Sequence, residues 1–248
     1  MGDPALGNPA NDYRNRIVLR CLGVPTPGAT IVDVGSGQGQ LAILLQETYP
    51  NSRVLGLEYS SEGVQRAKSA SEAAGLTVKF LQRDLLEETP ADQRLPESEL
   101  ASLAVCSEVL EHVDDPARLL RNASAYIAPG CRMVVTVPGG PRSALDRHIG
   151  HRRHFDAERI RGVLEQAGFH VERIERAGFP FFNLYRLLIV LRGQRLVQDL
   201  QAKDASSSRI QIALSRFFEK VFHWNIDDFV FGWQIVAVAK FEGGRSNH

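Results

Sequence analysis

The residues of this chain best suited to chemistry are Glu108, Glu111 and His112, which follow an apolar run at spacings of i, i+3 and i+4. On a helix this spacing places all three side chains on one face. Two carboxylates and an imidazole suit a divalent cation that accepts both oxygen and nitrogen ligands. We therefore treat them as candidate metal ligands, with a hydrogen-bond cluster at a helix start as the structural alternative.

A second candidate segment, 148–155, holds His148, His151 and His154, three of the seven histidines in the chain. Any of them could act as a general base, since imidazole titrates near neutral pH. His151 is the first choice because Gly150 gives its backbone freedom to turn into a cleft. His151 could instead supply a fourth metal ligand. The arginines between the histidines leave a third possibility, a basic lid over an acidic substrate.

A glycine-rich loop lies upstream, where the apolar run Ile31–Val34 ends in Gly35, Gly37 and Gly39. Alternate glycines remove the Cβ atoms that keep a ligand off the backbone, and the following helix start offers free N–H groups. The third glycine comes one residue too early for the dinucleotide fingerprint G-x-G-x-x-G, and no P-loop motif is present. The spacing therefore disfavours NAD, FAD and P-loop nucleotides.

Two acidic residues follow the next predicted strands. Glu58 ends the run 54–57, about 20 residues after the glycine loop, where a carboxylate can accept hydrogen bonds from both hydroxyls of a ribose. Asp84 follows the run 78–81 and could accept a hydrogen bond from an adenine amino group, while Leu85 could offer its backbone and an apolar surface to the ring. Together these positions predict a nucleoside site beside the glycine loop.

The elements that must position these residues alternate between strands and helices, which predicts an α/β class with a doubly wound, mainly parallel sheet. The predicted strands are 31–34, 54–57, 78–81, 103–106, 133–137, 170–175 and 233–240. The predicted helices run from Asn11 to Gly23, from Leu41 to about Pro50, over 62–74, from Pro116 to about Pro129-Gly130, and over 156–168.

Taken in order, VDVGSGQGQLA, Glu58, Asp84, EVLEHV and APGCRMVVTVP resemble the landmarks of class I S-adenosylmethionine (SAM) methyltransferases. The resemblance covers residues 11–178 and is strongest to the subgroup of ubiquinone-biosynthesis O-methyltransferases. It implies a seven-stranded Rossmann-like sheet with an antiparallel last strand, SAM as cofactor, and methyl transfer, with O-methylation preferred. The Glu-x-x-Glu-His pattern also resembles the ligands of Mg²⁺-dependent 2′-O-methyltransferases of small RNA.

The resemblance assigns expected roles to individual residues. Gly35, Gly37 and Gly39 approach the methionine part of SAM and Asp33 orients it. Glu58 holds the ribose, and Asp84 with Leu85 holds the adenine. The expected cofactor set is completed by neighbouring residues, namely Ser36, Tyr59 and Ser107. The expected metal set, for Mg²⁺ or another divalent cation, is Glu108, Glu111, His112 and His151.

A segment of residues 179–232 separates the sixth strand from the last, and its apolar runs predict an α-helical insertion of two helices joined by a polar turn at 203–208. The first run is too short to span a bilayer. We expect a substrate lid or a homodimer face. Peripheral membrane contact, with Arg192 and Arg195 at its edge, and plain added core are the alternatives. The expected organisation is a flexible tail (1–10), the SAM-binding core (11–178), the insertion (179–232), and the last strand with a tail (233–248).

Composition narrows the expected partners. The chain carries 29 basic and 29 acidic residues, so it has no general attraction to nucleic acid. We therefore expect a small-molecule acceptor with an apolar body. Three scattered cysteines and the absence of a signal or myristoylation pattern favour a cytoplasmic protein. The alternatives are a SAM-binding protein that does not methylate and a metal-dependent RNA 2′-O-methyltransferase.

Overall fold

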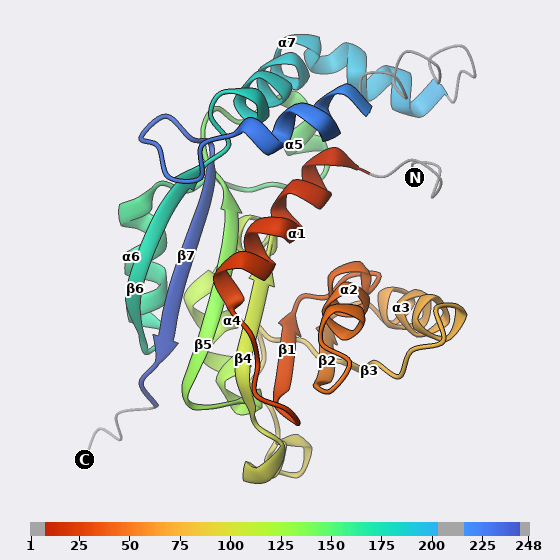
Figure 1. Ribbon diagram of the computed structural model, residues 1–248, viewed down its shortest axis with the longest axis vertical. Coiled ribbons are helices and arrows are strands. Elements are labelled where there is room, and N and C mark those ends of the chain that lie inside the picture. Colours follow the sequence, from red (N-terminus) through yellow and green to blue (C-terminus); the bar gives the residue numbers. More distant parts are fainter. Residues whose placement is uncertain (1–7, 203–215, 244–248) are drawn as a thin grey trace.

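The computed structural model describes residues 8–202 and 216–243, with side chains described for all of these except 192–202. Seven strands form one sheet in the order β3-β2-β1-β4-β5-β7-β6 (Figure 1). The strands are β1 Thr30–Val34, β2 Arg53–Glu58, β3 Lys79–Gln82, β4 Ala101–Ser107, β5 Ile127–Pro138, β6 Phe169–Ala177 and β7 Gln234–Phe241.

Helices cover both faces of this sheet. One core contains side chains of α1, α2 and α3, and the core on the opposite face contains side chains of α4 and α6. The α-helices are α1 Pro9–Leu22, α2 Gln40–Thr48, α3 Ser61–Ala73, α4 Pro116–Ala123, α5 Ala144–His148, α6 Ala157–Gln166 and α7 Phe181–Ala202. The prediction of a doubly wound α/β fold is confirmed.

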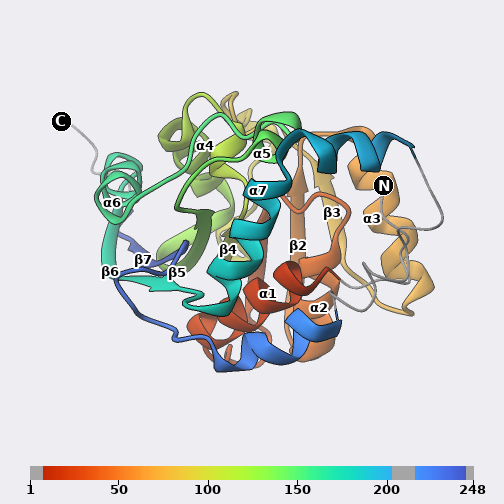
Figure 2. The same cartoon turned by 90° about the horizontal axis from the view of Figure 1, so that it is seen from above.

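Strand direction follows the predicted pattern. Strands β1 to β5 are parallel, while β7 pairs antiparallel with both β5 and β6. The carboxyl ends of the parallel strands therefore meet at one edge of the sheet, the upper edge in Figure 1. Helices α5 and α7 pack against each other at this edge, and Figure 2 shows α7 passing over the end of the sheet. Ligands of open α/β sheets bind at such an edge.

The central strands are buried on both faces, which explains their unbroken apolar runs. In β1, the side chains of Val32 and Val34 belong to the core on one face of the sheet, and the side chain of Ile31 belongs to the core on the other face. All five residues of β1 are buried. Burial on both faces leaves only the strand ends open to ligands, so the polar residues that follow the strands become the candidates for the site.

Three predicted boundaries differ clearly from the structure: the start of α1, the end of α4, and the start of β5, which is Ile127 rather than residue 133. Helix α1 begins at Pro9 rather than Asn11, because the Asn8 side chain caps it by accepting from the Ala10 N–H. Helix α4 ends at Ala123, well before Pro129-Gly130, because a 3₁₀ turn, Ser124–Tyr126, leads directly into β5. The Pro-Gly pair lies inside β5, where a register shift against β4 and a positive φ of 83° at Gly130 accommodate the extra residues.

The insertion is part of the core at its base. Helix α7 places Phe182 against Tyr13 of α1, with ring centroids 5.2 Å apart, and Phe222 lies 5.4 Å from the same ring. Residues 216–221 are helical, as predicted for the second half of the insertion. The predicted polar turn 203–208 lies outside the described residues. Added core, one of the alternatives from the sequence, therefore accounts for the inner face of the insertion.

One face of α7 carries an exposed apolar row. Leu184, Leu187, Leu188 and Leu191 follow one another at i, i+3, i+4 and i+7, and each is more than a third exposed. An exposed apolar stripe of this kind indicates a contact surface. Within the described ranges, no helix combines the length and apolar character needed to cross a bilayer.

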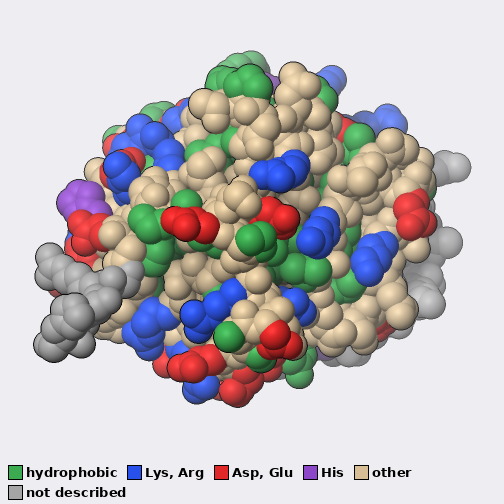
Figure 3. Space-filling view, turned by 90° about the horizontal axis from the view of Figure 1, so that it is seen from below, with side chains coloured by type: hydrophobic (Ala, Val, Ile, Leu, Met, Phe, Trp, Pro, Cys, Tyr) green, Lys and Arg blue, Asp and Glu red, His purple; other side chains and the backbone are tan. Residues whose placement is uncertain are grey.

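Charge is mixed on the face opposite the site. Viewed from below, basic and acidic side chains are interspersed with apolar ones (Figure 3). This agrees with the neutral net charge of the whole sequence. All three cysteines, Cys21, Cys106 and Cys131, are buried and free.

Candidate functional site

The glycine-rich loop connects β1 to α2. Gly35, Gly37 and Gly39 all have positive φ, at 74°, 55° and 81°. At Gly35 a Cβ would lie 2.6 Å from a methyl carbon of Val109, so a side chain there does not fit. At Gly37 a Cβ would meet no atom within 4 Å, so this glycine faces open space. The loop therefore presents bare backbone to whatever lies above it.

A hollow of about 520 Å³ lies in front of this loop. Its walls come from the start of α1, from the loop and α2, and from the end of β4. The lining residues used below are Arg14, Asp33, Gly37, Ser36, Ser107 and Glu108. Three segments far apart in the sequence thus meet at the carboxyl edge of the sheet, where the prediction placed a ligand.

Glu58 lies beside the glycine loop, as its position after β2 predicted. Its Oε2 accepts from the Gly37 N–H at 2.9 Å, and its Oε1 accepts from the Ser60 N–H at 2.8 Å. A carboxylate oxygen has two lone pairs, so each of these oxygens retains one for a further donor. The carboxylate is thus fixed by the backbone and still able to accept two more hydrogen bonds.

Asp33 is a buried carboxylate in the wall of the hollow. It is 2% exposed, and its Oδ2 has no hydrogen-bond partner among the described residues. Burial, together with the nearby negative charge of Glu58, raises the pKa of Asp33 to about 7. A cationic group bound in the hollow would therefore favour the ionised form of Asp33 and would be attracted to its negative charge. The Ser36 hydroxyl is also buried without a partner there.

The remaining expected cofactor residues are placed differently. Asp84 is exposed and its Oδ1 accepts from the Leu86 N–H at 2.9 Å. Leu85 is buried in the core, and its carbonyl accepts from Asn122 at 2.9 Å, so its side chain offers no free apolar surface. Tyr59 is 69% exposed. The hydroxyl of Ser107 is 2.8 Å from that of Thr136, at the edge of the hollow.

The segment after β4 does not form the predicted helical face. Glu108 has a φ of 55°, in the left-handed region that a non-glycine residue adopts only under restraint. Its Oε1 accepts from Gln234 at 2.9 Å and from Thr136 at 3.3 Å, and its Oε2 lies 3.6 Å from Arg14. The helical interpretation is therefore wrong. Glu108 turns toward the hollow and Glu111 turns away from it, into a 3₁₀ turn, Leu110–His112.

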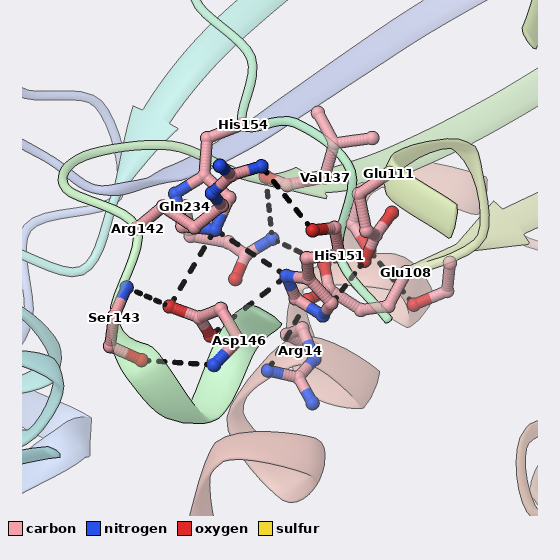
Figure 4. Close-up of polar contacts among 12 residues, drawn as sticks. Arg14, Glu108, Glu111, Val137, Arg142, Ser143, Asp146, His151, His154 and Gln234 are labelled. Carbon is pink, nitrogen blue, oxygen red and sulfur yellow. Dashed lines mark hydrogen bonds and ion pairs between the residues drawn. The ribbon is translucent and has the colours of Figure 1, made fainter. Parts of the chain in front are cut away.

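Three of the four expected metal ligands come together in a second cluster (Figure 4). Nitrogen or oxygen atoms of Glu111, His112 and His151 lie within 4.8 Å of one another, and Figure 4 shows Glu111 beside His151. Glu111 is fully buried, and neither of its carboxylate oxygens has a hydrogen-bond partner among the described residues. The backbone ties the two segments together, since the Arg152 N–H donates to the Glu111 carbonyl at 2.8 Å. Glu108 is not part of this group, because other partners hold its carboxylate.

Burial disfavours the charged forms of all three side chains in this cluster. Burial, followed by the charge of Glu108, raises the pKa of Glu111 well above its usual range. Burial, followed by the neighbouring His112, lowers the pKa of His151 to about 4, and burial also lowers that of His112. His151 Nε2 lies 3.9 Å from Glu111 Oε1, but with a pKa of about 4 this imidazole carries no charge near neutral pH, so the contact is not an ion pair. A buried carboxyl and two neutral imidazoles are the groups that a divalent cation binds.

The ring orientation of His151 leaves one nitrogen lone pair directed at Glu111. His154 Nδ1 lies 3.0 Å from the Gly140 carbonyl, which can only accept, so this nitrogen carries the proton. Its Nε2 then accepts from His151 Nδ1 at 3.4 Å, and His151 Nε2 is left free on the side of Glu111. Nδ1 of His112 faces Gly150, 3.5 Å from where a Cβ would be.

A second group shares His151 and was not predicted. Asp146, His151 and His154 have ligand atoms within 4.8 Å of one another. Asp146 is fully buried, and its Oδ2 lies 2.9 Å from Arg186 of α7. Burial raises the pKa of Asp146, but Arg186 and hydrogen bonds from Ser143 outweigh it and hold this pKa below its usual range. His148, at the exposed end of α5, belongs to neither group.

Sequence reasoning missed three contributors to the site. The pattern Ser143-x-x-Asp146 is a capping box and indicates a helix start at Ser143, with Asp146 in the first turn. Both of its reciprocal hydrogen bonds form. Arg186 interrupts an apolar helix, and a buried cation in such a place needs an anionic partner. No local pattern marks Gln234, which reaches Glu108 from β7.

The strand order, the antiparallel β7 and the glycine loop beside an acidic residue define the Rossmann-like methyltransferase class of fold. Residues 10–174 match the family described as the methyltransferase domain, so the chain belongs to that family. The predicted resemblance is thereby confirmed. A stretch of 106 residues is 34% identical to the ubiquinone biosynthesis O-methyltransferase of Methylobacterium sp. (strain 4-46), covering 43% of this chain and 39% of that protein.

Solved structures share the fold across nearly the whole chain. The cyclase SpnF has a TM-score of 0.61 at 21% identity, with 95% of this chain and 83% of SpnF covered. A geranyl diphosphate C-methyltransferase from Streptomyces coelicolor A3(2) has a TM-score of 0.58 at 16% identity, with 94% and 81% covered. The chain spans about two fifths of the length of the curated relatives it matches. The fold is thus shared by different chemistries, and the site must indicate which one applies.

Proposed function

We propose that this chain is a SAM-dependent methyltransferase that methylates an oxygen of a small acceptor at a site containing a divalent cation. One observation carries the proposal. Glu108 at the end of β4 lines the hollow beside the glycine loop, and its charge also acts on Glu111, His112 and His151 of the cluster. A methyl donor and a cation-bound acceptor would then face each other across that residue.

The hollow fits SAM in charge and in hydrogen-bonding capacity. We assign the two remaining lone pairs of Glu58 to the ribose hydroxyls. We assign the unpartnered Asp33, together with Ser36 and Ser107, to the cationic methionine end, which would lie over the bare backbone at Gly37. Asp84 and Tyr59, exposed beyond β3 and β2, would border the adenine.

The second cluster fits a divalent cation. Glu111 has two buried oxygens without partners, and a nitrogen of each imidazole belongs to the set of ligand atoms within 4.8 Å of one another. These three residues would hold the ion, with its remaining positions left for the acceptor. A bound cation would lower the pKa of an acceptor hydroxyl and so make its oxygen a better nucleophile. Mg²⁺ favours oxygen ligands, whereas Mn²⁺ and Zn²⁺ also accept imidazole nitrogens. Two imidazoles and one carboxylate therefore accommodate Mn²⁺ or Zn²⁺ as well as Mg²⁺.

A general-base role for His151 without a metal is weaker. A pKa of about 4 makes this imidazole a poor acceptor for the proton of a hydroxyl group near neutral pH. His154 has its Nδ1 committed to Gly140, and His148 is exposed on α5. The same depressed pKa keeps His151 in the neutral form that a metal requires. The geometry and the charge state therefore favour a ligand over a base.

The insertion would cover the acceptor. Helix α7 lies against α5, next to the cluster, and its row of leucines from Leu184 to Leu191 is exposed. An acceptor with an apolar body would gain by burying itself under this row. A homodimer face or peripheral membrane contact are the alternative uses of the same leucines, and the Discussion gives the measurement that separates them.

Formation of S-adenosylhomocysteine tests the proposal directly. The chain is incubated with SAM and a panel of small hydroxylated, carboxylated and amino compounds, with and without divalent cations. We expect transfer only to acceptors with a hydroxyl or carboxylate oxygen, and only when a cation is present. A chain that binds SAM tightly but transfers no methyl group to any acceptor would instead be a SAM-binding protein of other function. Transfer to a short RNA alone would contradict the small-molecule assignment.

A further inference from the structure

The carboxylate of Asp146 is held by the capping box at the start of its own helix, α5. It is fully buried in the first turn of α5. Its Oδ2 accepts from the Ser143 N–H at 2.7 Å, while the Ser143 hydroxyl accepts from the Asp146 N–H at 3.0 Å. This reciprocal pair leaves the carboxylate little freedom to rotate. Asp146 therefore presents its two oxygens to the histidines in one orientation.

Arg186 of α7 binds the same carboxylate. Its Nη2 donates to Oδ2 of Asp146 at 2.9 Å, and the Arg186 side chain is only 14% exposed. Among the described side chains of the insertion, Arg186 alone makes a polar contact with Asp146 or the histidines. The insertion thus reaches the cluster through one buried ion pair. With a guanidinium already bound, Asp146 is poorly suited to hold a second cation itself.

The carboxylate faces two imidazoles. Oδ1 of Asp146 has no hydrogen-bond partner among the described residues and lies 3.8 Å from His151 Nδ1. Oδ2 lies 3.7 Å from His154 Nε2. Nδ1 of His151, whose hydrogen-bond partner is His154 Nε2 at 3.4 Å, thus also faces a negative charge, while its Nε2 faces Glu111. Histidines that bind metals usually direct the other ring nitrogen at a carboxylate or carbonyl in this way.

We infer that Asp146 and Arg186 are positioning residues that hold His151 with its Nε2 directed at Glu111. The inference rests on the metal centre proposed above and adds a structural role for the insertion. Helix α7 is then more than a cover for the acceptor, because its one inward cation fixes the carboxylate that orients a metal ligand. Neither residue would touch the acceptor or the methyl group.

Metal affinity of the whole chain tests this role. Titration calorimetry with Mn²⁺ would compare Asp146→Asn, Arg186→Gln and Arg186→Lys with the unchanged chain. Arg20→Gln is the matched control, since it removes another arginine–carboxylate bond, the 2.6 Å contact to Glu175. We expect Asp146→Asn to weaken Mn²⁺ binding about 10- to 100-fold, Arg186→Gln to weaken it less, and Arg186→Lys to restore most of the loss. Arg20→Gln should bind Mn²⁺ like the unchanged chain.

A second measurement needs no metal. Long-range ¹H–¹⁵N spectra of the metal-free chain report which nitrogen of each histidine carries the proton, and His151→Gln assigns the His151 signals. We expect the proton on Nδ1 in the unchanged chain, and a mixture of tautomers in Asp146→Asn and Arg186→Gln. SAM affinity, measured in parallel, should stay constant and shows that the variants are folded.

The two measurements separate the inference from the proposed function. Unchanged Mn²⁺ affinity and an unchanged His151 tautomer in both variants would overturn the positioning role and leave the metal centre standing. If the unchanged chain binds no Mn²⁺, Mg²⁺ or Zn²⁺, the proposed metal centre is wrong. The tautomer spectra alone then decide whether Asp146 and Arg186 orient His151.

Discussion

Replacement of Glu58 by alanine is the sharpest test of the cofactor assignment. Each oxygen of this carboxylate already accepts one backbone N–H, at 2.9 and 2.8 Å, and keeps one lone pair. A ribose with two hydroxyls can therefore form one hydrogen bond to each oxygen. The alanine variant loses both bonds but leaves the glycine loop in place, since water can reach the two N–H groups that the carboxylate releases.

The expected loss follows from ordinary magnitudes. A hydrogen bond to a charged group contributes about 1.5–3 kcal/mol. We apply this range to the pair rather than to each bond, because the two bonds share one side chain and water partly replaces them. At about 1.4 kcal/mol per factor of ten, Glu58→Ala should weaken SAM binding about 10- to 100-fold.

Titration calorimetry with SAM and with S-adenosylhomocysteine measures this loss. Glu62→Ala is the control, since Glu62 is an exposed glutamate in the first turn of α3, paired with Arg66 on the same helix. It should bind SAM like the unchanged chain. If Glu58→Ala also retained full affinity, Glu58 would not hold the ribose, and the placement of SAM in this hollow would have to be abandoned.

Three further predictions address the metal, the buried aspartate and the insertion. Chelation should abolish methyl transfer and a divalent cation should restore it; Glu111→Gln should not be rescued, and full turnover in excess chelator would exclude the metal centre. Burial raises the pKa of Asp33 to about 7, so below that pH the free chain holds a proton that cationic SAM displaces. Calorimetry in two buffers of different ionisation enthalpy should show proton release at about pH 6, none at about pH 8.5, and SAM affinity that rises with pH up to about 7; pH-independent binding would contradict this. Leu188→Gln and Leu191→Gln should raise the KM for the acceptor and leave SAM affinity unchanged. An unchanged KM with altered sedimentation, or with lost vesicle binding, would assign these leucines to a dimer or a membrane instead.

The fold could be predicted because local patterns and chain order agree. Each of the central strands contains a short apolar run, and burial on both faces demands such runs. Boundaries were predicted less well where tertiary structure overrides local preference. Pro129-Gly130 is a strong helix stop, yet it lies within β5, because the bulge against β4 absorbs it. No pattern within β5 reveals a bulge whose partner is another strand.

The cofactor side of the site was also largely visible in the sequence. Glu58 was expected beside the glycine loop from its position after β2, and its carboxylate does contact the Gly37 N–H. The other side was predicted only in part. The left-handed backbone of Glu108 removes it from the helical face that its spacing to Glu111 indicates. The restraint comes from Gln234 and Thr136, two residues on other strands, so spacing alone could not show it.

The buried carboxylates at this edge of the sheet give the strongest physical argument for a cation. Glu108 has Arg14 within 3.6 Å, and Asp146 has Arg186 at 2.9 Å. Glu111 is as deeply buried as Asp146, but neither of its oxygens has a partner among the described residues. A buried carboxyl without a hydrogen bond destabilises the fold, and one with two imidazoles beside it has the donor set that suits a divalent cation. Replacing Glu111 by glutamine should therefore leave the metal-free chain at least as stable, whereas a structural role for this carboxyl requires the opposite.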